Sequence, residues 1–251
     1  MLPQPATSPR SKNLFMDLST SKRYKYVKRI FKWRQMDFEF ALWQMVYLCC
    51  APRRVYRNFH YHKEAKHQWA RDDPAFLVLL SFWLLVSSVI FAVSLHLGMV
   101  GFIKFLLWVV FVDCIGVGLV IAGFLWLITN KYLRIPGSSN IEHVVEFGYS
   151  FDVHLNAFLP LLIVLHVVQL IGLLFDPSMF IARFFGNTSW LIALTYYIYI
   201  TFLGYSALPF LRNTAVILYP FVALVFVYIL SLSLSWNITQ GIVDFYKYRV
   251  L

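Results

Sequence analysis

The side chains best suited to chemistry cluster in the stretch HYHKEAKHQWARDDPAF, residues 60–76. Its three histidines, its glutamate and its aspartate pair are all of the types that bind zinc. Neither an H-x-x-x-H pair nor a cysteine pair accompanies them, and Lys63 and Lys66 would repel a cation. We therefore predict no metal site, and nothing else in the sequence implies a cofactor.

The sequence also lacks the patterns of known catalytic sites. No Ser/His/Asp arrangement, phosphate-binding glycine loop or paired-carboxylate site is evident. Cys49, Cys50 and Cys114 have no zinc-site spacing, and the two neighbouring cysteines cannot readily bridge each other. Cys49 and Cys50 are either candidates for palmitoylation or a buried free pair. We predict no catalytic residues, and that the protein is not an enzyme.

The second half of the stretch, ARDDPAF, is typical of the start of a helix. Asp73 is a suitable N-cap, Pro74 suits the first helical position, and Asp72 favours the positive end of the helix dipole. Trp69 and Arg71 would then anchor this helix at the edge of a membrane, where aromatic and basic residues are common.

Cations and aromatic rings alternate through the longer string APRRVYRNFHYHKEAKHQWARDD, residues 51–73. Such a surface suits anionic lipid, at about 1 kcal/mol per cation, or an acidic partner protein. Rings beside cations also resemble a stacking platform for RNA, although no RNA-binding fold signature accompanies them. We predict a partner-binding cytosolic face made of Arg53, Arg54, Tyr56, Arg57, Tyr61, Lys63, Trp69 and Arg71.

A second group of polar residues interrupts apolar segments further along the chain. Asp113 lies among glycines that would let another helix approach closely. Asp152, Asn156, His166 and Gln169 share one face of a helix, so they form a polar stripe that could meet Asp113. We expect these residues to hydrogen-bond between helices. The alternative is a lipid- or solute-handling pathway that uses Asp113, Asp152 and His166.

Composition identifies the chain as a membrane protein. Of its 251 residues, 60% are hydrophobic and 14% charged, whereas soluble domains have about 45–50% and about 25%. Residues 1–74 hold 15 of the 22 Lys and Arg but only 6 of the 12 acidic residues, so this part carries +9 of the total charge of +10.

The elements that must position these residues are helices. Five apolar segments have the roughly 20 residues needed to cross a bilayer. Only Arg212 and Asn213 separate the last two, which predicts a tight helical hairpin. We predict an all-α polytopic membrane helical bundle with spans at about 75–97, 102–128, 151–175, 189–211 and 214–236.

The part before the first span divides in two. Residues 1–23 have the composition of a flexible cytosolic tail. Residues 24–74 form a basic and aromatic cytosolic segment, in which the apolar run 38–50 is too short to span and is predicted as an interfacial helix. Residues 75–251 form the five-span transmembrane domain.

Charge bias predicts the orientation. An odd number of spans puts the two termini on opposite sides of the membrane. The side of the amino terminus holds 18 Lys and Arg and the other side holds four, so the amino terminus is predicted to be cytosolic. The sequons at Asn187 and Asn237 lie on the other side, but each abuts a span, which disfavours glycosylation.

Three strings resemble the Unc-fifty family of eukaryotic Golgi membrane proteins. They are APRRVYRNFHYHKEAKHQWARDDPAF, IPGSSNIEHVVEFGYSFDVHLNAFLPLLIVLHVVQL and GIVDFYKYR. The similarity runs from about residue 30 to the carboxyl terminus. The family is also distantly similar to the Yip-type Golgi proteins that engage Rab GTPases.

This resemblance implies a five-span protein of the Golgi membrane with a cytosolic amino terminus. It implies a non-enzymatic role in vesicular and protein transport: recruitment of an Arf guanine-nucleotide exchange factor, and support for the transport of receptor cargo such as nicotinic acetylcholine receptors. A relative has been linked to RNA binding and to the inner nuclear membrane, which gives the alternative function and location. No catalytic residue is implied.

Overall fold

The structure is a computed structural model, and it describes residues 36–57, 69–71, 73–135, 144–172, 175–176 and 179–250. The predicted tail 1–23, residues 24–35, 58–68 and 72 of the basic segment 24–74, and with them Tyr61 and Lys63 of the predicted cytosolic face, lie outside the described residues. The described part is helical and contains no β-strand beyond an isolated bridge between Arg134 and Leu211. The predicted all-α class is confirmed for this part of the chain.

Helices account for nearly all of the described residues. The α-helices are α2 (Phe38–Cys50), α4 (Ala75–Ser94), α5 (Met99–Leu107), α6 (Val117–Ile128), α7 (Phe147–Ile163), α8 (Gln169–Gly172), α9 (Phe180–Ser206), α10 (Pro220–Ser233) and α11 (Ile238–Val250). Three π-helical stretches, η2 (Trp108–Gly116), η3 (Thr129–Leu133) and η5 (Val164–Val168), continue neighbouring α-helices, and η6 (Thr214–Leu218) is a 3-10 turn.

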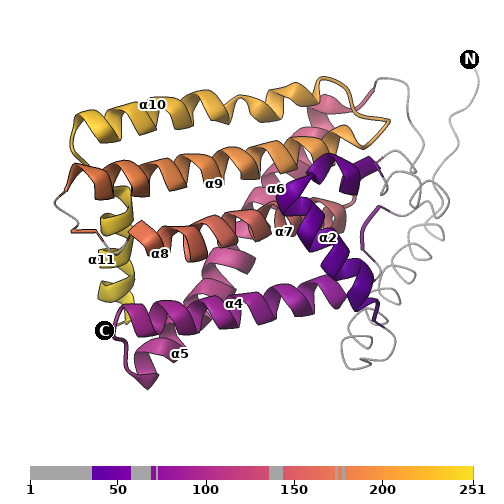
Figure 1. Cartoon of the computed structure of the whole chain (residues 1–251). Helices are drawn as coiled ribbons and strands as arrows, with labels where there is room; N and C mark the ends of the chain where they lie inside the picture. The colour runs from indigo at the N-terminus through magenta and orange to yellow at the C-terminus, as the bar shows by residue number, and fades with distance from the viewer. Residues whose placement is uncertain are drawn as a thin grey trace, which may run out of the picture.

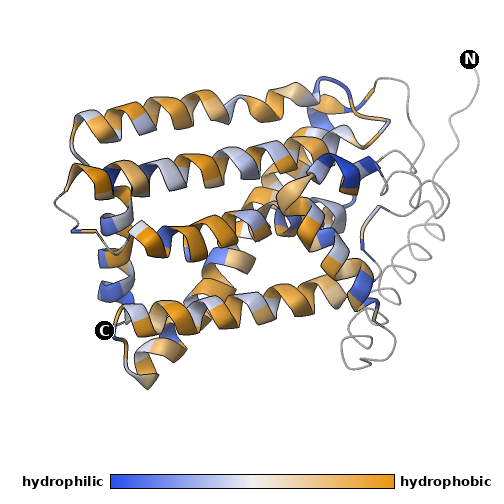
Figure 2. Ribbon diagram, viewed as in Figure 1, coloured by the Kyte–Doolittle hydropathy of each residue, from blue (hydrophilic) through white to orange (hydrophobic). Residues whose placement is uncertain are grey.

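The long helices form a bundle that is closed by a short helix at each end (Figure 1). Helix α9 packs against both α7 and α10, and α6 packs against α7. At one end α11 stands across the bundle and contacts α9 and α5, whereas α2 lies at the other end against α4 and α7. Polar residues gather at these two ends, and the helices between them are mostly hydrophobic (Figure 2).

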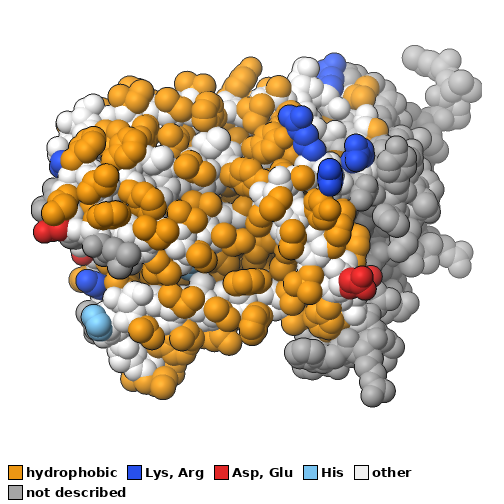
Figure 3. Space-filling view, in the orientation of Figure 1, with side chains coloured by type: hydrophobic (Ala, Val, Ile, Leu, Met, Phe, Trp, Pro, Cys, Tyr) orange, Lys and Arg blue, Asp and Glu red, His pale blue; other side chains and the backbone are white. Residues whose placement is uncertain are grey.

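The surface of the bundle is apolar, as expected for a protein whose solvent is lipid. Figure 3 shows one face covered largely by hydrophobic side chains, with Lys and Arg gathered mainly at one end. On α10 the side chains of Val222 and Phe226 are 71% and 65% exposed. Exposed hydroxyl groups of α4 hydrogen-bond to their own helix, as Ser81 Oγ does to the Leu77 carbonyl at 2.8 Å and Ser94 Oγ to the Ile90 carbonyl at 2.9 Å, because hydrocarbon offers them no other partner.

Among the described residues, four helices are long and apolar enough to cross a membrane. They are Ala75–Ser94, Met99–Leu133, Phe147–Gly172 and Thr214–Ser233, and they correspond to the first, second, third and fifth predicted spans. The second is longer than predicted, with 35 residues.

Most of the predicted fourth span, residues 189–206 of 189–211, falls within α9, which is not among these four helices. It has 27 residues, but its four tyrosines and several small polar residues lower its hydropathy. The count of five spans is therefore not confirmed.

The connection after α9 differs from the predicted tight hairpin. Helix α9 begins at Phe180 and ends at Ser206, so seven residues, 207–213, precede η6. In this connection Asn213 has a positive φ of 53°. Backbone pairing joins it to the end of η3, because the Arg212 amide donates to the Leu133 carbonyl at 2.8 Å. The predicted hairpin, with only two linking residues, is wrong on this point.

Two shorter helices frame the bundle. Helix α2 covers the run 38–50 that was predicted as a helix, although nothing tests its position at a membrane interface. Its start is tied to the start of α4 by Asp73, whose carboxylate accepts from the Asp37 amide at 2.8 Å and the Ala75 amide at 3.0 Å. Asp73 thus stabilises the start of α4, as predicted for a residue at the beginning of this helix. The N-cap itself is Pro74, which was predicted at the first helical position. The C-terminal helix α11 was not predicted.

Candidate functional site

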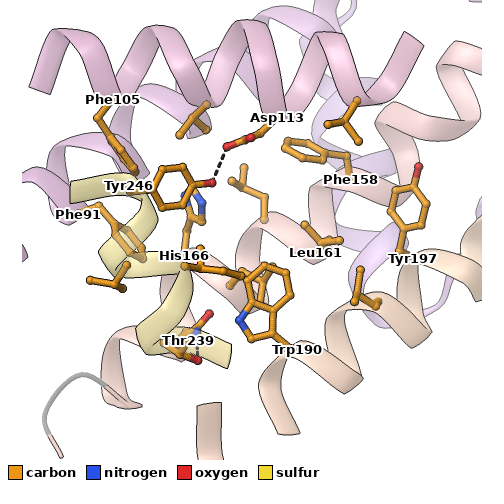
Figure 4. Close-up of a pocket in the computed structure, with 18 of the residues that line it drawn as sticks. Phe91, Phe105, Asp113, Phe158, Leu161, His166, Trp190, Tyr197, Thr239 and Tyr246 are labelled. Carbon is orange, nitrogen blue, oxygen red and sulfur yellow. Dashed lines mark hydrogen bonds between the residues drawn. The ribbon is translucent and has the colours of Figure 1, made fainter. Parts of the chain in front are cut away.

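A pocket of about 270 Å³ lies inside the bundle, between α11 and the membrane helices (Figure 4). Aromatic and aliphatic side chains make up most of its wall, including Phe91 of α4, Phe158 of α7 and Trp190 of α9. Polar groups are few and come from different elements. They are Asp113, His154, His166, Gln169, Trp190, Tyr197, Thr239 and Tyr246.

Asp113 is the one acidic residue among the described residues that line the pocket, and no Lys or Arg lines it. Its Oδ2 accepts a hydrogen bond from the Tyr246 hydroxyl of α11 at 2.6 Å. A carboxylate offers about four acceptor positions. The bond to Tyr246 therefore leaves it able to accept from a further group in the pocket.

His166 and Gln169 also line the pocket, near the end of the helix that begins with α7. His166 Nδ1 lies 3.0 Å from Ser87 Oγ of α4, and its ring is 4.9 Å from that of Phe91. The Gln169 side chain contacts the Thr239 hydroxyl of α11, and with its amide turned it also accepts from the Trp190 indole. These contacts join α4, α9 and α11 around the pocket.

His154 of α7 also lines the pocket, and its ring joins α7 to η2 and α9. Its Nε2 lies 3.0 Å from the Cys114 carbonyl. A carbonyl can only accept, so Nε2 is the protonated nitrogen, and Nδ1 accepts from the Tyr197 hydroxyl at 2.7 Å. A neutral ring satisfies both contacts. The imidazole packs directly on Gly118 of α6, where an added Cβ would lie 2.4 Å from the ring.

The other predicted stripe residues lie in a separate polar cluster. The Arg71 amide donates to Asp152 at 2.6 Å, and the Arg71 guanidinium donates to Asn156. Asn156 in turn donates to the Tyr56 hydroxyl at 3.2 Å. The guanidinium also lies 3.8 Å from the centroid of the Phe76 ring. Asp152 and Asn156 therefore hold the segment before α4 against α7.

The predicted single stripe that meets Asp113 is thus wrong. His166 and Gln169 share a pocket with Asp113, but Asp152 and Asn156 do not line it. The expected hydrogen bonds between helices are present in both places. Sequence reasoning missed His154, Tyr197 and Tyr246. Tyr246 lies in the string GIVDFYKYR, but nothing in the residues alone assigns it to a pocket.

The structure also divides the predicted cytosolic face. Arg53, Arg54 and Arg57 are exposed on the short helix 52–57. Tyr56 on the same helix is 5% exposed and bonds to Asn156, and its burial raises the pKa of the hydroxyl well above its usual value. These three arginines remain on the surface as predicted, and Tyr56 does not.

Trp69 and Arg71 are likewise directed into the bundle. The Trp69 ring packs edge-on against Tyr149 and Phe210, with centroids 6.4 Å and 6.0 Å away. Arg71 bonds to Asn156, as described above. Both residues hold the segment before α4 in place and are only partly exposed, and their role in binding a partner stays a prediction.

The sequons and cysteines have distinct environments. Asn187 is 1% exposed; it donates to Ser231 Oγ at 2.9 Å and to the Trp236 carbonyl at 2.8 Å, and accepts from the Ile238 amide at 3.0 Å. Asn187 in the folded chain is therefore closed to glycosylation. Cys50 is exposed, whereas Cys49 is partly buried, and burial, followed by the neighbouring Cys50, raises the pKa of the Cys49 thiol to about 11.

Asn237 has a different role from Asn187. Its side-chain oxygen accepts from the Gln240 amide at 3.1 Å, in the first turn of α11. The Thr239 of its sequon is 8% exposed. Asn237 thus helps to begin the helix that closes the pocket.

Metal-binding side chains do not gather in the described part of the chain, where no group of three or more His, Cys, Asp and Glu residues is placed to hold an ion. The histidines of the stretch 60–67 lie outside the described residues. The predicted absence of a metal site there is therefore untested.

Comparison with known proteins gives a single family. The sequence profile of the UNC-50 family matches residues 26–247. The chain is 56% identical to Protein unc-50 homolog A of Xenopus laevis over the full length of both chains. It is 60% identical to the Protein unc-50 homolog of Homo sapiens, over 92% of this chain and 89% of that protein, and 52% identical to that of Drosophila melanogaster, over 92% and 84%.

No solved structure matches the chain. The family match spans the described helices from α2 to most of α11, and it includes both polar clusters and the short helix 52–57. The resemblance seen in the three sequence strings is confirmed: the chain belongs to the UNC-50 family.

Proposed function

We propose that this protein is a non-enzymatic Golgi membrane protein of vesicular transport, whose cytosolic end recruits a peripheral trafficking protein. The family resemblance suggests an Arf guanine-nucleotide exchange factor as the partner and receptors such as nicotinic acetylcholine receptors as cargo. The observation that carries the proposal is the helix 52–57. It exposes Arg53, Arg54 and Arg57 while Val55 and Tyr56 are buried beneath them.

This arrangement fixes the cations in space. Val55 is 3% exposed and Tyr56 is bonded to Asn156, so the short helix is held against the bundle. Arg53 Nε donates to the Tyr199 hydroxyl of α9 at 2.7 Å, and the Arg54 guanidinium lies 5.6 Å from the centroid of the Tyr47 ring. A rigid row of cations suits an acidic protein surface, because little side-chain freedom is lost on binding.

The topology we propose has five spans, with α9 as the fourth. Helix α9 has 27 residues and packs between α7 and α10. Both of these neighbours belong to helices that are long and apolar enough to cross a membrane. Its tyrosine hydroxyls are satisfied within the protein, as Tyr197 is by His154 and Tyr196 by the Leu48 and Cys49 carbonyls. Five spans put the helix 52–57 in the cytosol and α11 in the lumen.

Selective permeabilisation tests this topology. Epitope tags at the two ends of the full chain are probed with antibodies after digitonin opens only the plasma membrane. We expect the amino-terminal tag alone to be stained. Staining of both tags would mean an even number of spans. It would also place α11 in the cytosol, where we expect the trafficking protein to bind.

The recruitment test uses Arg54→Ala/Arg57→Ala. Arg53 is left intact, because its bond to Tyr199 contributes to packing as well as charge. The matched control is Lys247→Ala/Arg249→Ala, which removes two cations from α11. In cells that lack the wild-type chain, return of the exchange factor to the Golgi is measured by fluorescence recovery after photobleaching.

We expect Arg54→Ala/Arg57→Ala to lower steady-state recruitment and the control pair to leave it unchanged. An exposed ion pair contributes about 0.2–1 kcal/mol, so the loss of two corresponds to a roughly 2- to 30-fold weaker interaction. Unchanged recruitment, with both variants still at the Golgi, would refute the assignment of this surface. A variant that redistributes to the nuclear envelope would instead favour the alternative location.

The other functions predicted from the sequence have different support. Part of the string that suggested RNA binding, residues 58–68, lies outside the described residues, and RNA binding stays a prediction. Asp152 does not belong to the predicted pathway for a lipid or solute, because it lies outside the pocket and accepts a hydrogen bond from the Arg71 amide. Asp113 and His166 do line one pocket, which favours ligand binding over conduction along a stripe.

A further inference from the structure

The pocket behind α11 combines an apolar wall with one carboxyl group. Phe91, Phe105 and Phe158 contribute rings, and Asp113 is the acidic residue. Of the described residues that line the pocket, none is a Lys or Arg. Removal of a carboxylate from water is costly unless an opposite charge or several donors compensate it. The protein supplies the Tyr246 hydroxyl as a donor and no lining cation.

The local backbone also distinguishes this pocket from ordinary packing. Asp113 lies in the nine-residue π-helical stretch η2, and His166 lies in a second one, η5. π-Helical turns are rare and occur frequently at functional sites, because the extra residue in the turn redirects side chains. Both stretches direct polar side chains toward the same space (Figure 4).

The volume limits what can enter. An engineered cavity of about 150 Å³ holds benzene, and the pocket here has about 270 Å³. By that ratio it accommodates roughly ten non-hydrogen atoms. A small aromatic amine would fit as a whole, and a long-chain amine would place its head and first carbons in the pocket with the rest of the chain outside.

We propose that this pocket binds an amphiphile with one protonated amine, which donates to the Asp113 carboxylate while its apolar body lies among the aromatic rings. The carboxylate of Asp113 supplies the negative charge that attracts the protonated amine. Face contacts from rings such as Phe158 add cation–π attraction. His154 contributes no competing positive charge when its ring is neutral, and a neutral ring satisfies both of its contacts. This site is independent of the proposed recruitment surface.

The test uses the full-length chain in phosphatidylcholine nanodiscs, with empty nanodiscs for background. Binding of tritiated dodecylamine is measured by scintillation proximity. Dodecanol and dodecanoate compete as probes with the same chain and a neutral or negative head. Phenethylamine competes as a water-soluble aromatic amine, and its potency relative to unlabelled dodecylamine distinguishes a soluble ligand from a membrane-dissolved one.

Three variants isolate the role of Asp113. Asp113→Asn keeps the shape but removes the charge, and a lost charge-assisted hydrogen bond should weaken amine binding by about 10- to 100-fold. The matched control is Asp244→Asn, because Asp244 is exposed on α11 and bonds to Gln240 at 2.8 Å. Tyr246→Phe removes a donor to Asp113 and leaves its charge, so affinity for the amine should be kept or increased.

Saturable binding of dodecylamine, weak competition by dodecanol and dodecanoate, and loss of binding in Asp113→Asn alone would support the site. Equal competition by dodecanol would overturn it, since it would show that charge is not recognised. An equal loss in Asp113→Asn and Asp244→Asn would also overturn it, as surface attraction would then explain binding. Parallel losses in Asp113→Asn and Tyr246→Phe would show that Asp113 only holds α11. The comparison of probes on the wild-type chain remains decisive if a variant fails to fold.

Discussion

Gly118 of α6 provides a sharp test of how the helices pack. A Cβ added at this position would lie 2.4 Å from both Cδ2 and Nε2 of His154, which is closer than atoms can approach. His154 is 3% exposed and bonded on both ring nitrogens, so it cannot turn away without a cost. We therefore expect Gly118→Ala to destabilise the bundle.

The magnitude follows from three contributions. Overpacking a filled interior costs about 1–3 kcal/mol. A displaced imidazole also weakens its bond to the Cys114 carbonyl, at about 0.5–1.5 kcal/mol. Replacement of glycine by alanine inside a helix offsets about 1 kcal/mol of this cost. The net loss is roughly 0.5–3.5 kcal/mol, which for a chain of this size lowers the midpoint of thermal unfolding by roughly 1–14 °C.

The same helix offers a matched control. At Gly123 an added Cβ would meet only Phe147, at an ordinary contact distance of 3.9 Å. Gly123→Ala should therefore gain up to about 1 kcal/mol from helix propensity without a clash. Thermal unfolding of the purified full-length variants in detergent, followed by intrinsic fluorescence, separates the two outcomes.

A double variant tests the cause directly. In a His154→Ala background the ring is absent, so Gly118→Ala should become neutral or stabilising. If Gly118→Ala and Gly123→Ala unfold at the same temperature, the close approach of α6 to His154 is not as described. If Gly118→Ala costs as much in the His154→Ala background as in the wild type, the clash lies elsewhere.

Three further predictions concern single side chains. Asn187→Ala should cost about 2–4 kcal/mol, because it removes three hydrogen bonds that join α9 to Ser231 of α10, the Trp236 carbonyl and the Ile238 amide; an unchanged thermal midpoint would contradict this. In a chain with the other cysteines replaced by Ser, the alkylation rate of Cys49 should rise about tenfold per pH unit from pH 8 to 10, since its thiol has a pKa of about 11; a plateau near pH 9 would contradict the burial. Asp73→Ala should cost about 1 kcal/mol and speed hydrogen exchange at Ala75.

Hydropathy predicted most helices because a membrane helix needs an uninterrupted apolar run, and such runs are visible in the sequence. It failed where tertiary contacts satisfy polar groups. The sequence FIARFFGNT, residues 180–188, was excluded from the fourth span, yet it forms the first turns of α9. Arg183 in this segment reaches the Ser235 carbonyl at 3.3 Å, and Asn187 is bonded to three groups. A sequence window contains none of these partners.

The polar stripe failed for a different physical reason. A helical wheel assumes one constant turn angle, but π-helical turns intervene at 108–116 and 164–168, and each shifts the direction of the residues beyond it. The wheel also omits residues outside the helix. Arg71, which was expected at the surface, is the partner of Asn156. Residue types thus identified the polar groups of the interior, but not their division into two sites.

The buried position of Tyr56 gives a way to separate folding from recruitment. Tyr56→Phe removes the bond to Asn156 at 3.2 Å and should cost about 1 kcal/mol of stability. Because the ring stays in place beneath the helix 52–57, Arg54 and Arg57 should keep their positions and recruitment should be normal. Arg54→Ala/Arg57→Ala should show the converse, with normal stability and lost recruitment. If Tyr56→Phe instead lost recruitment at unchanged stability, the phenol would be a contact with the partner, as its sequence environment first indicated.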